Sequence, residues 1–263
     1  MHIDVSNVSS IPNSIKDRII DEIKSLPGNV VEKIKKQKIK YDIDVKNAIE
    51  DYLGIRIYNY FYEDLVALFS DYKLVCFHST KVLNKKYIIT NGIKTNEWNT
   101  YSDHLRKTLQ LIGVKATEEN QIINIIKKQY NWKYPKQLRE PQLCFYSDIG
   151  MLNEGMRAGY EQFCENIGGE LARDALKDKY PDLYKYLREN GKAYLVKFVI
   201  PFSNIKGYNQ DDIVYQFISY YAGKFFWNYN CEIHFDGNTD KAIPVADIIE
   251  LIPYNIERYY FNE

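Results

Sequence analysis

Cysteine and histidine are scarce in this chain of 263 residues, which contains four of each. The cysteines Cys76, Cys144, Cys164 and Cys231 form no C-x-x-C pair, and the histidines form no H-E-x-x-H motif. The usual spacings of zinc ligands are therefore missing. Three of the cysteines lie in apolar stretches, where a thiol behaves as a small hydrophobic group. We predict reduced core cysteines and no metal site.

Long apolar runs and several nucleotide-binding and hydrolase motifs are also missing. No run approaches the ~18 apolar residues that identify a membrane-spanning helix. The first ten residues show neither a basic start nor an apolar segment of the kind found in secretion signals. The chain has no G-x-G-x-x-G, no P-loop and no G-x-S-x-G. We therefore expect a cytoplasmic protein with no membrane partner.

The net charge is zero, because 35 basic residues balance 35 acidic ones, but the charges are unevenly distributed. Residues 72–140 carry 13 Lys and Arg against five Asp and Glu. A basic segment of this kind attracts phosphate groups, or it forms the solvated face of helices. An RNA-directed enzyme that uses residues 72–140 is therefore one alternative, although no dense basic run with interleaved aromatic residues supports it.

Residues 1–71 show the apolar spacing of helices. Ile15, Ile19 and Ile23 recur at helical intervals, and Pro27-Gly28 ends that pattern. Further helices are expected over 30–39, 44–53 and 58–69. We interpret residues 1–71 as a helical N-terminal extension, and residues 72–263 as the main domain.

The main domain combines predicted strands with helices. Helices are expected within 102–131, 153–165, 170–179, 181–189 and 213–221. The predicted strands are Lys73–His78, Gln142–Ser147, Ala193–Phe202, Asn230–Phe235 and a last strand within Ile243–Ile252. Because strands and helices do not alternate as βαβ units, the fold class is α+β.

Three of these strands carry polar or aromatic side chains at their ends or within them. The first ends in His78-Ser79-Thr80, the second in Phe145-Tyr146, and the fourth carries Glu232. Each has an ordinary interpretation. His78 can be a packing residue, Ser79 and Thr80 can cap a helix, and Tyr146 can fill a strand. Glu232 lies either on the solvent face or in a cleft.

A nucleophilic pair of Cys231 with His78 is a further alternative. It requires a reactive thiol, whereas the cysteines in the predicted strands are expected to be buried.

The combination resembles the ADP-ribosyltransferase fold, in its branch with diphtheria toxin and poly(ADP-ribose) polymerase. In that family the first strand ends in His-Gly-[Ser/Thr], and here the residues are His78-Ser79-Thr80. A strand–Tyr–helix–Tyr unit follows, matched by Tyr146 and Tyr160, with Phe145 as an alternative stacking residue. Glu232 matches the glutamate of the late strand. The resemblance covers about residues 72–255.

The resemblance implies a split β-sheet core with surrounding helices, and NAD as the substrate without a metal. It implies cleavage of the nicotinamide–ribose bond, with transfer of ADP-ribose to a macromolecular acceptor (protein or nucleic acid) or to water. Glu232, His78 and Tyr146 are then catalytic, and NAD is held by His78, Ser79, Thr80, Phe145, Tyr146 and Tyr160. A toxin or phage-defence effector with an inhibitory partner protein is the implied setting.

One departure from the family pattern supports a different hypothesis. Ser79 stands where the family has glycine, so a side chain occupies the backbone position that would grip the nicotinamide amide. A catalytically inactive interaction or immunity protein on the same fold is therefore the main alternative.

Overall fold

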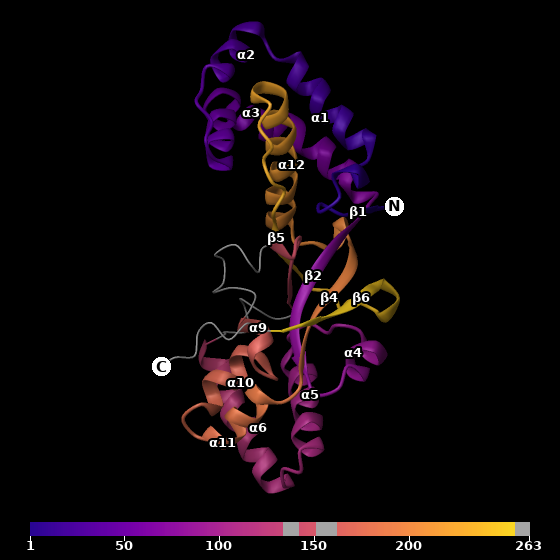
Figure 1. Cartoon of the computed structure of the whole chain (residues 1–263), viewed down its shortest axis with the longest axis vertical. Coiled ribbons are helices and arrows are strands. Elements are labelled where there is room, and N and C mark those ends of the chain that lie inside the picture. The colour runs from indigo at the N-terminus through magenta and orange to yellow at the C-terminus, as the bar shows by residue number, and fades with distance from the viewer. Residues whose placement is uncertain (134–141, 151–161, 256–263) are drawn as a thin grey trace. The chain divides into compact units, whose positions relative to one another are not determined.

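A computed structural model describes residues 1–133, 142–150 and 162–255 (Figure 1). Helices and a sheet are mixed, which confirms the α+β class. The chain forms two compact units, which do not coincide with the expected regions 1–71 and 72–263, because residues 200–237 group with the N-terminal helices. Unit 1 comprises residues 1–75, 146–148 and 200–237, and unit 2 comprises the described parts of 76–145, 149–199 and 238–263.

Unit 1 is built mainly from helices. α12 (Gly207–Trp227) packs against α1 (Asn13–Ser25), α2 (Gly28–Lys35) and α3 (Asp42–Ser70) (Figure 1). Ile15, Ile19 and Ile23 are buried along α1, as the helical spacing predicts. The short elements of this unit are β1 (His2–Ile3), η1 (Val8–Ser10) and η2 (Phe202–Asn204).

An aromatic cluster closes the core of unit 1. The ring of Phe69 lies 4.9 Å from that of Phe217, edge to face, and 5.1 Å from that of Phe202, as measured between centroids. All three side chains are completely buried. Such rings bury large apolar areas, so the end of α3 is fixed to α12 and η2.

The structure has one helix, α3, where the sequence predicts two over 44–53 and 58–69. The gap between the two predicted helices contains Gly54, and an isolated glycine inside a helix costs only about 1 kcal/mol. At the start of α3 the Asp44 carboxylate accepts the backbone N–H groups of Lys40 and Tyr41, each at 2.9 Å. These bonds lower the pKa of Asp44. The charged cap therefore fixes where the helix begins.

The sheet has the strand order β5-β3-β2-β4-β6, and each of these strands has residues in unit 2. β4 and β6 are antiparallel, with Leu195 opposite Ile252 and an irregularity between Lys197 and Phe198. In unit 1, β1 pairs in parallel with the first residues of β2. The strands are β2 (Lys73–Val82), β3 (Leu143–Tyr146), β4 (Lys192–Pro201), β5 (Asp236–Thr239) and β6 (Ile248–Tyr254).

The helices of unit 2 gather beside one another (Figure 1), and buried side chains form a hydrophobic core among them. Leu105, Ile122, Ile126, Leu176 and Leu187 are completely or almost completely buried in it. Ile122 and Ile126 lie four residues apart, the spacing that places side chains on one face of a helix. The helices in the described part of unit 2 are α4 (Lys86–Asn91), α5 (Trp98–Leu111), α6 (Ala116–Lys133), α9 (Gln162–Glu165), α10 (Gly169–Leu176) and α11 (Pro181–Glu189), and η3 (Val245–Asp247) precedes β6.

Glycine and proline mark helix ends in unit 2. Gly92 caps α4 with a φ of 69°, and Pro181 is in the first turn of α11. Gly168 and Gly191 have φ values of 83° and 80°. Positive φ is the conformation in which a glycine is favoured over other residues.

Acid is expected to destabilise unit 2 through His104. Its ring lies 3.8 Å from the ring of Tyr87, and burial, with a smaller contribution from Lys107, lowers its pKa to about 4. In the unfolded chain the His104 ring has its ordinary pKa of about 6.5 and binds a proton below that pH. In the folded chain it stays neutral down to about pH 4, so acid favours the unfolded state. Stability is complete above pH 6.5 and falls as the pH drops towards 4. Between pH 7.5 and 5.5 we expect a loss of about 1 kcal/mol from this residue.

The measurement is urea unfolding of the unchanged protein and of His104→Gln at both pH values. The variant should lose less stability than the unchanged protein on acidification. Equal losses in both proteins would show that His104 does not titrate in this way.

Candidate functional site

His78 lies within β2 and not at its end, because the strand continues to Val82. Its Nδ1 atom lies 2.9 Å from the carbonyl oxygen of Cys144 on β3, within unit 2. A carbonyl can only accept, so Nδ1 donates the proton of this bond. Burial lowers the pKa of His78, while the bond to Cys144 opposes that shift. The ring is therefore neutral at pH 7, with Nε2 left as a hydrogen-bond acceptor.

The predicted site residues Ser79 and Thr80, in β2, and Phe145, on β3, are buried or partly buried and contribute to packing. Ser79 is only 4% exposed, and Thr80 is partly buried within the strand, so neither residue caps a helix. Phe145 on β3 is 1% exposed and packs edge to face on Phe198, with 6.3 Å between the centroids. Phe145 thus belongs to the core of unit 2. No ring face of Phe145 is open for stacking on a ligand here.

One cysteine departs from the prediction of buried thiols. Cys144 is exposed, whereas Cys76, Cys164 and Cys231 are buried, and all four are free thiols. Side chains alternate between the two faces of a strand, and on β3 Leu143 and Phe145 occupy the buried face. Cys144 therefore points away from it.

Tyr146 ends β3 in unit 1 and is 1% exposed. The next residue, Ser147, exchanges two hydrogen bonds with Phe235: its N–H donates to the Phe235 carbonyl at 2.9 Å, and its Oγ accepts the Phe235 N–H at 3.0 Å. Tyr146 is therefore one residue from a direct connection to the segment that carries Glu232.

The segment around Glu232 is extended but is not the predicted strand. Cys231, Ile233 and Phe235 are buried while Glu232 is exposed, which is the alternation that the sequence predicts. The strand itself, β5, begins only at Asp236, immediately after the predicted strand Asn230–Phe235. The Glu232 N–H donates to the Asp42 carboxylate at 3.0 Å. The Asp42 side chain thus accepts the backbone N–H of Glu232, which in a sheet would donate to a neighbouring strand.

Glu232 has a histidine partner. Its Oε2 lies 2.5 Å from Nε2 of His234, and the two side chains are 63% and 34% exposed. The separation by two residues places both side chains on one face of the extended segment. This pair, at the surface of unit 1, offers a carboxylate whose orientation is held by an imidazole.

Asp42 is the residue that sequence reasoning missed. It is the first residue of α3, and it accepts the Glu232 N–H. Its carboxylate, near the Tyr229 hydroxyl, also raises the pKa of Tyr229 to about 12. Asp42 and Glu232 are 190 residues apart. No local pattern marks such a pair, so only the fold could reveal it.

The thiol of Cys231 is buried in unit 1. Burial, followed by the charge of Asp42, raises its pKa to about 12. The reactive form of cysteine is the thiolate, which is almost absent at pH 7 for such a group. The alternative pairing of Cys231 with His78 therefore loses its chemical basis.

The predicted site residues divide between the two units. His78, Ser79, Thr80 and Phe145 belong to unit 2, whereas Tyr146 and Glu232 belong to unit 1. Tyr160 lies outside the described residues. The bond from His78 to Cys144, in unit 2, and the bonds between Ser147 and Phe235, in unit 1, each connect two of the predicted segments.

The part of the chain that the structure describes has neither a metal-binding group nor a membrane-spanning helix. Among these residues, no three His, Cys, Asp or Glu side chains are grouped so that they could hold a metal ion. None of the described helices is at once long enough and apolar enough to cross a membrane.

Comparisons with known proteins gave no match: no protein-family model, no curated protein and no solved structure is significantly similar to this chain.

Proposed function

We propose that this protein is an NAD-dependent ADP-ribosyltransferase, or an NAD glycohydrolase, of the His-Tyr-Glu type. Two hydrogen bonds carry the proposal, one within each unit. In unit 2, His78 on β2 bonds to the carbonyl oxygen of Cys144 on β3, the strand that ends in Tyr146. In unit 1, Ser147, which follows Tyr146, bonds to Phe235, three residues after Glu232. Each bond joins two of the segments that carry the predicted His, Tyr and Glu.

The chemistry assigns a role to each residue type. Cleavage breaks the bond between nicotinamide and C1′ of the ribose, and the bonding electron pair leaves with nicotinamide. Positive charge develops on the ribose, and Glu232 stabilises it while accepting a ribose hydroxyl proton in a hydrogen bond. An acceptor nucleophile, or water, then bonds to C1′ and loses a proton. The neutral Nε2 of His78 accepts a hydrogen bond from the adenosine-side ribose.

The burial of the aromatic side chains Phe145 and Tyr146 favours a second candidate function, that of an inactive interaction protein. Phe145 and Tyr146 are each 1% exposed, and stacking on nicotinamide requires an open ring face. Ser79 is also buried at the position where the resembling family has glycine. A catalytically inactive interaction or immunity protein on the same fold would have such closed positions.

The decisive experiment is NAD turnover by the purified full-length chain. Free nicotinamide is measured by chromatography, with water alone and with a cell extract as a source of acceptors, using NAD labelled in the adenosine part. Release of nicotinamide with labelling of a macromolecule identifies a transferase, and release without labelling identifies a glycohydrolase. If neither occurs at millimolar NAD, the proposal is wrong and the interaction protein is the better reading.

A further inference from the structure

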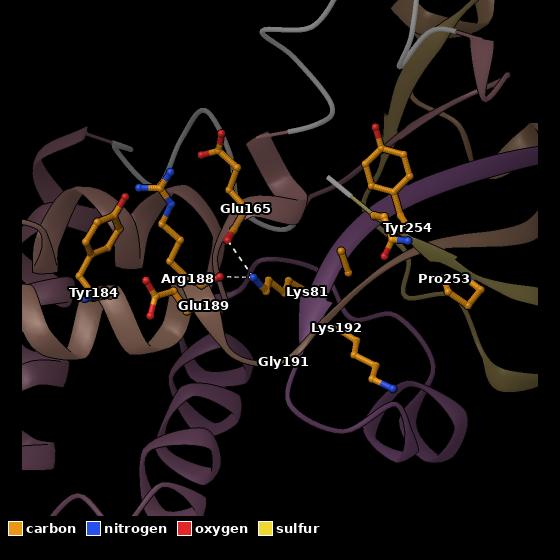
Figure 2. A pocket seen from close by; sticks show the side chains of 12 residues that line it. Lys81, Glu165, Tyr184, Arg188, Glu189, Gly191, Lys192, Pro253 and Tyr254 are labelled. Atoms are coloured by element: carbon orange, nitrogen blue, oxygen red, sulfur yellow. Dashed lines mark hydrogen bonds between the residues drawn. The ribbon is translucent and has the colours of Figure 1, made fainter. Parts of the chain in front are cut away.

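Unit 2 contains a hollow of about 910 Å³ that none of the predicted NAD residues lines. It lies among the ends of α9 and α11, the start of β4 and the end of β6 (Figure 2). This volume is within the range of small-molecule sites, which is about 300–1,000 Å³. The hollow is therefore large enough for a ligand of nucleotide size.

Positive charge predominates in the lining. The four cationic side chains are those of Lys81, Lys185, Arg188 and Lys192, and the carboxylates are those of Glu165 and Glu189. Lys185 and Lys192 are exposed, and neither forms an ion pair with a residue that the structure describes. Lysine and arginine groups of this kind bind phosphate oxygens through charge-assisted hydrogen bonds.

The walls of the hollow are held by main-chain contacts. The Lys81 ammonium donates to the carbonyl oxygens of Glu165, at 3.2 Å, and of Arg188, and so joins the ends of α9 and α11 (Figure 2). Gly191 turns the chain with a φ of 80°, and a Cβ atom there would approach the Val82 carbonyl oxygen to 2.8 Å. The shape is therefore built into the backbone and does not depend on surface side chains alone.

Two tyrosines add aromatic surface to this charge. Figure 2 shows Tyr184 and Tyr254 on opposite sides of Lys81. Pro253 and Ala193 contribute apolar surface. Stacking of a base on an aromatic side chain is worth about 1–3 kcal/mol. The tyrosines could therefore hold the base of a ligand while the cationic side chains bind its phosphate groups.

The hollow is separate from the position of His78. Lys81 follows His78 by three residues on β2. Alternate side chains of a strand point to opposite faces, so these two residues face opposite sides of the sheet. A ligand bound at Lys81 therefore does not occupy the place predicted for NAD.

We propose that this hollow binds a free nucleotide through its phosphate groups, with Lys185, Arg188 and Lys192 as the phosphate-binding side chains. A tyrosine ring, that of Tyr184 or Tyr254, packs against the base. The site does not depend on NAD cleavage, and its test measures binding directly.

The test is calorimetric titration of the full-length chain with ADP and, separately, with inorganic pyrophosphate. ADP should bind and pyrophosphate should bind more weakly, because it lacks the base. The double variant Lys185→Glu/Lys192→Glu should weaken ADP binding at least ~10-fold, since two attractive charges become repulsive. Both residues are exposed, so circular dichroism should show an unchanged fold. Lys128→Glu, an exposed lysine on α6 outside the hollow, should bind ADP within twofold of the unchanged protein.

Three results would overturn the inference. The first is no ADP binding at millimolar concentration, and the second is equal ADP binding by the double variant. The third is binding of a short RNA oligonucleotide, lost in the double variant, without binding of free ADP. That last result would identify a nucleic-acid surface in place of a nucleotide site.

Discussion

Replacement of Glu232 by glutamine is expected to slow the release of nicotinamide from NAD at least ~100-fold. Glutamine keeps the size of the side chain but removes the negative charge that stabilises the developing positive charge on the ribose. The fold should be unaffected, because the Glu232 side chain is 63% exposed and its backbone N–H still donates to Asp42. The measurement is the initial rate of nicotinamide release at saturating NAD.

The matched control is Glu118→Gln, which removes another exposed carboxylate, on α6. Its rate should equal that of the unchanged protein. A Glu232→Gln protein with full activity would remove Glu232 from the catalytic role while leaving NAD cleavage itself intact, and the search for a carboxylate would then turn elsewhere.

Replacement of Gly92 by alanine is expected to lower the free energy of unfolding by about 3 kcal/mol or more. Gly92 has a φ of 69° and a ψ of −162°, a region that is essentially restricted to glycine. A Cβ atom there would collide with the carbonyl oxygen of Ile243. That oxygen accepts the Ile93 N–H at 3.0 Å, and the Ile243 N–H donates back to Ile93 at 2.9 Å. The backbone has no room to move away without breaking this bridge.

Gly113→Ala separates the two causes of that loss. Gly113 also has a positive φ, of 82°, but no atom lies within 4 Å of the place of its Cβ. It should cost about 1 kcal/mol, from backbone strain alone. Urea unfolding of both variants is the measurement. Equal losses would show that the collision with Ile243 is relieved by a small shift.

Local features of the fold are well predicted by the sequence. The isoleucine spacing of α1, the proline in the first turn of α11 and the glycine that ends α4 each act within a few residues. These signals depend on φ preferences and on the 3.6-residue period, and both are properties of the chain segment itself. They hold whatever the rest of the chain does.

Features that depend on distant contacts are less well predicted. The alternation around Glu232 is as predicted, yet no strand forms over Asn230–Phe235, and β5 begins at Asp236. The Glu232 N–H instead bonds to Asp42, 190 residues away in the sequence. Likewise the environment of His78 comes from a carbonyl 66 residues away. The sequence can therefore identify His78 and Glu232 as candidate site residues. Their hydrogen-bond partners, Cys144 and Asp42, are known only from the tertiary fold.

The exposed thiol of Cys144 makes this protein suited to selective labelling. Because the other three cysteines are buried, a maleimide reagent under native conditions should modify one thiol rapidly and the others only on unfolding. The same residue supplies the carbonyl oxygen that His78 binds. A fluorescent probe on Cys144 would thus be attached to the residue whose backbone oxygen binds His78.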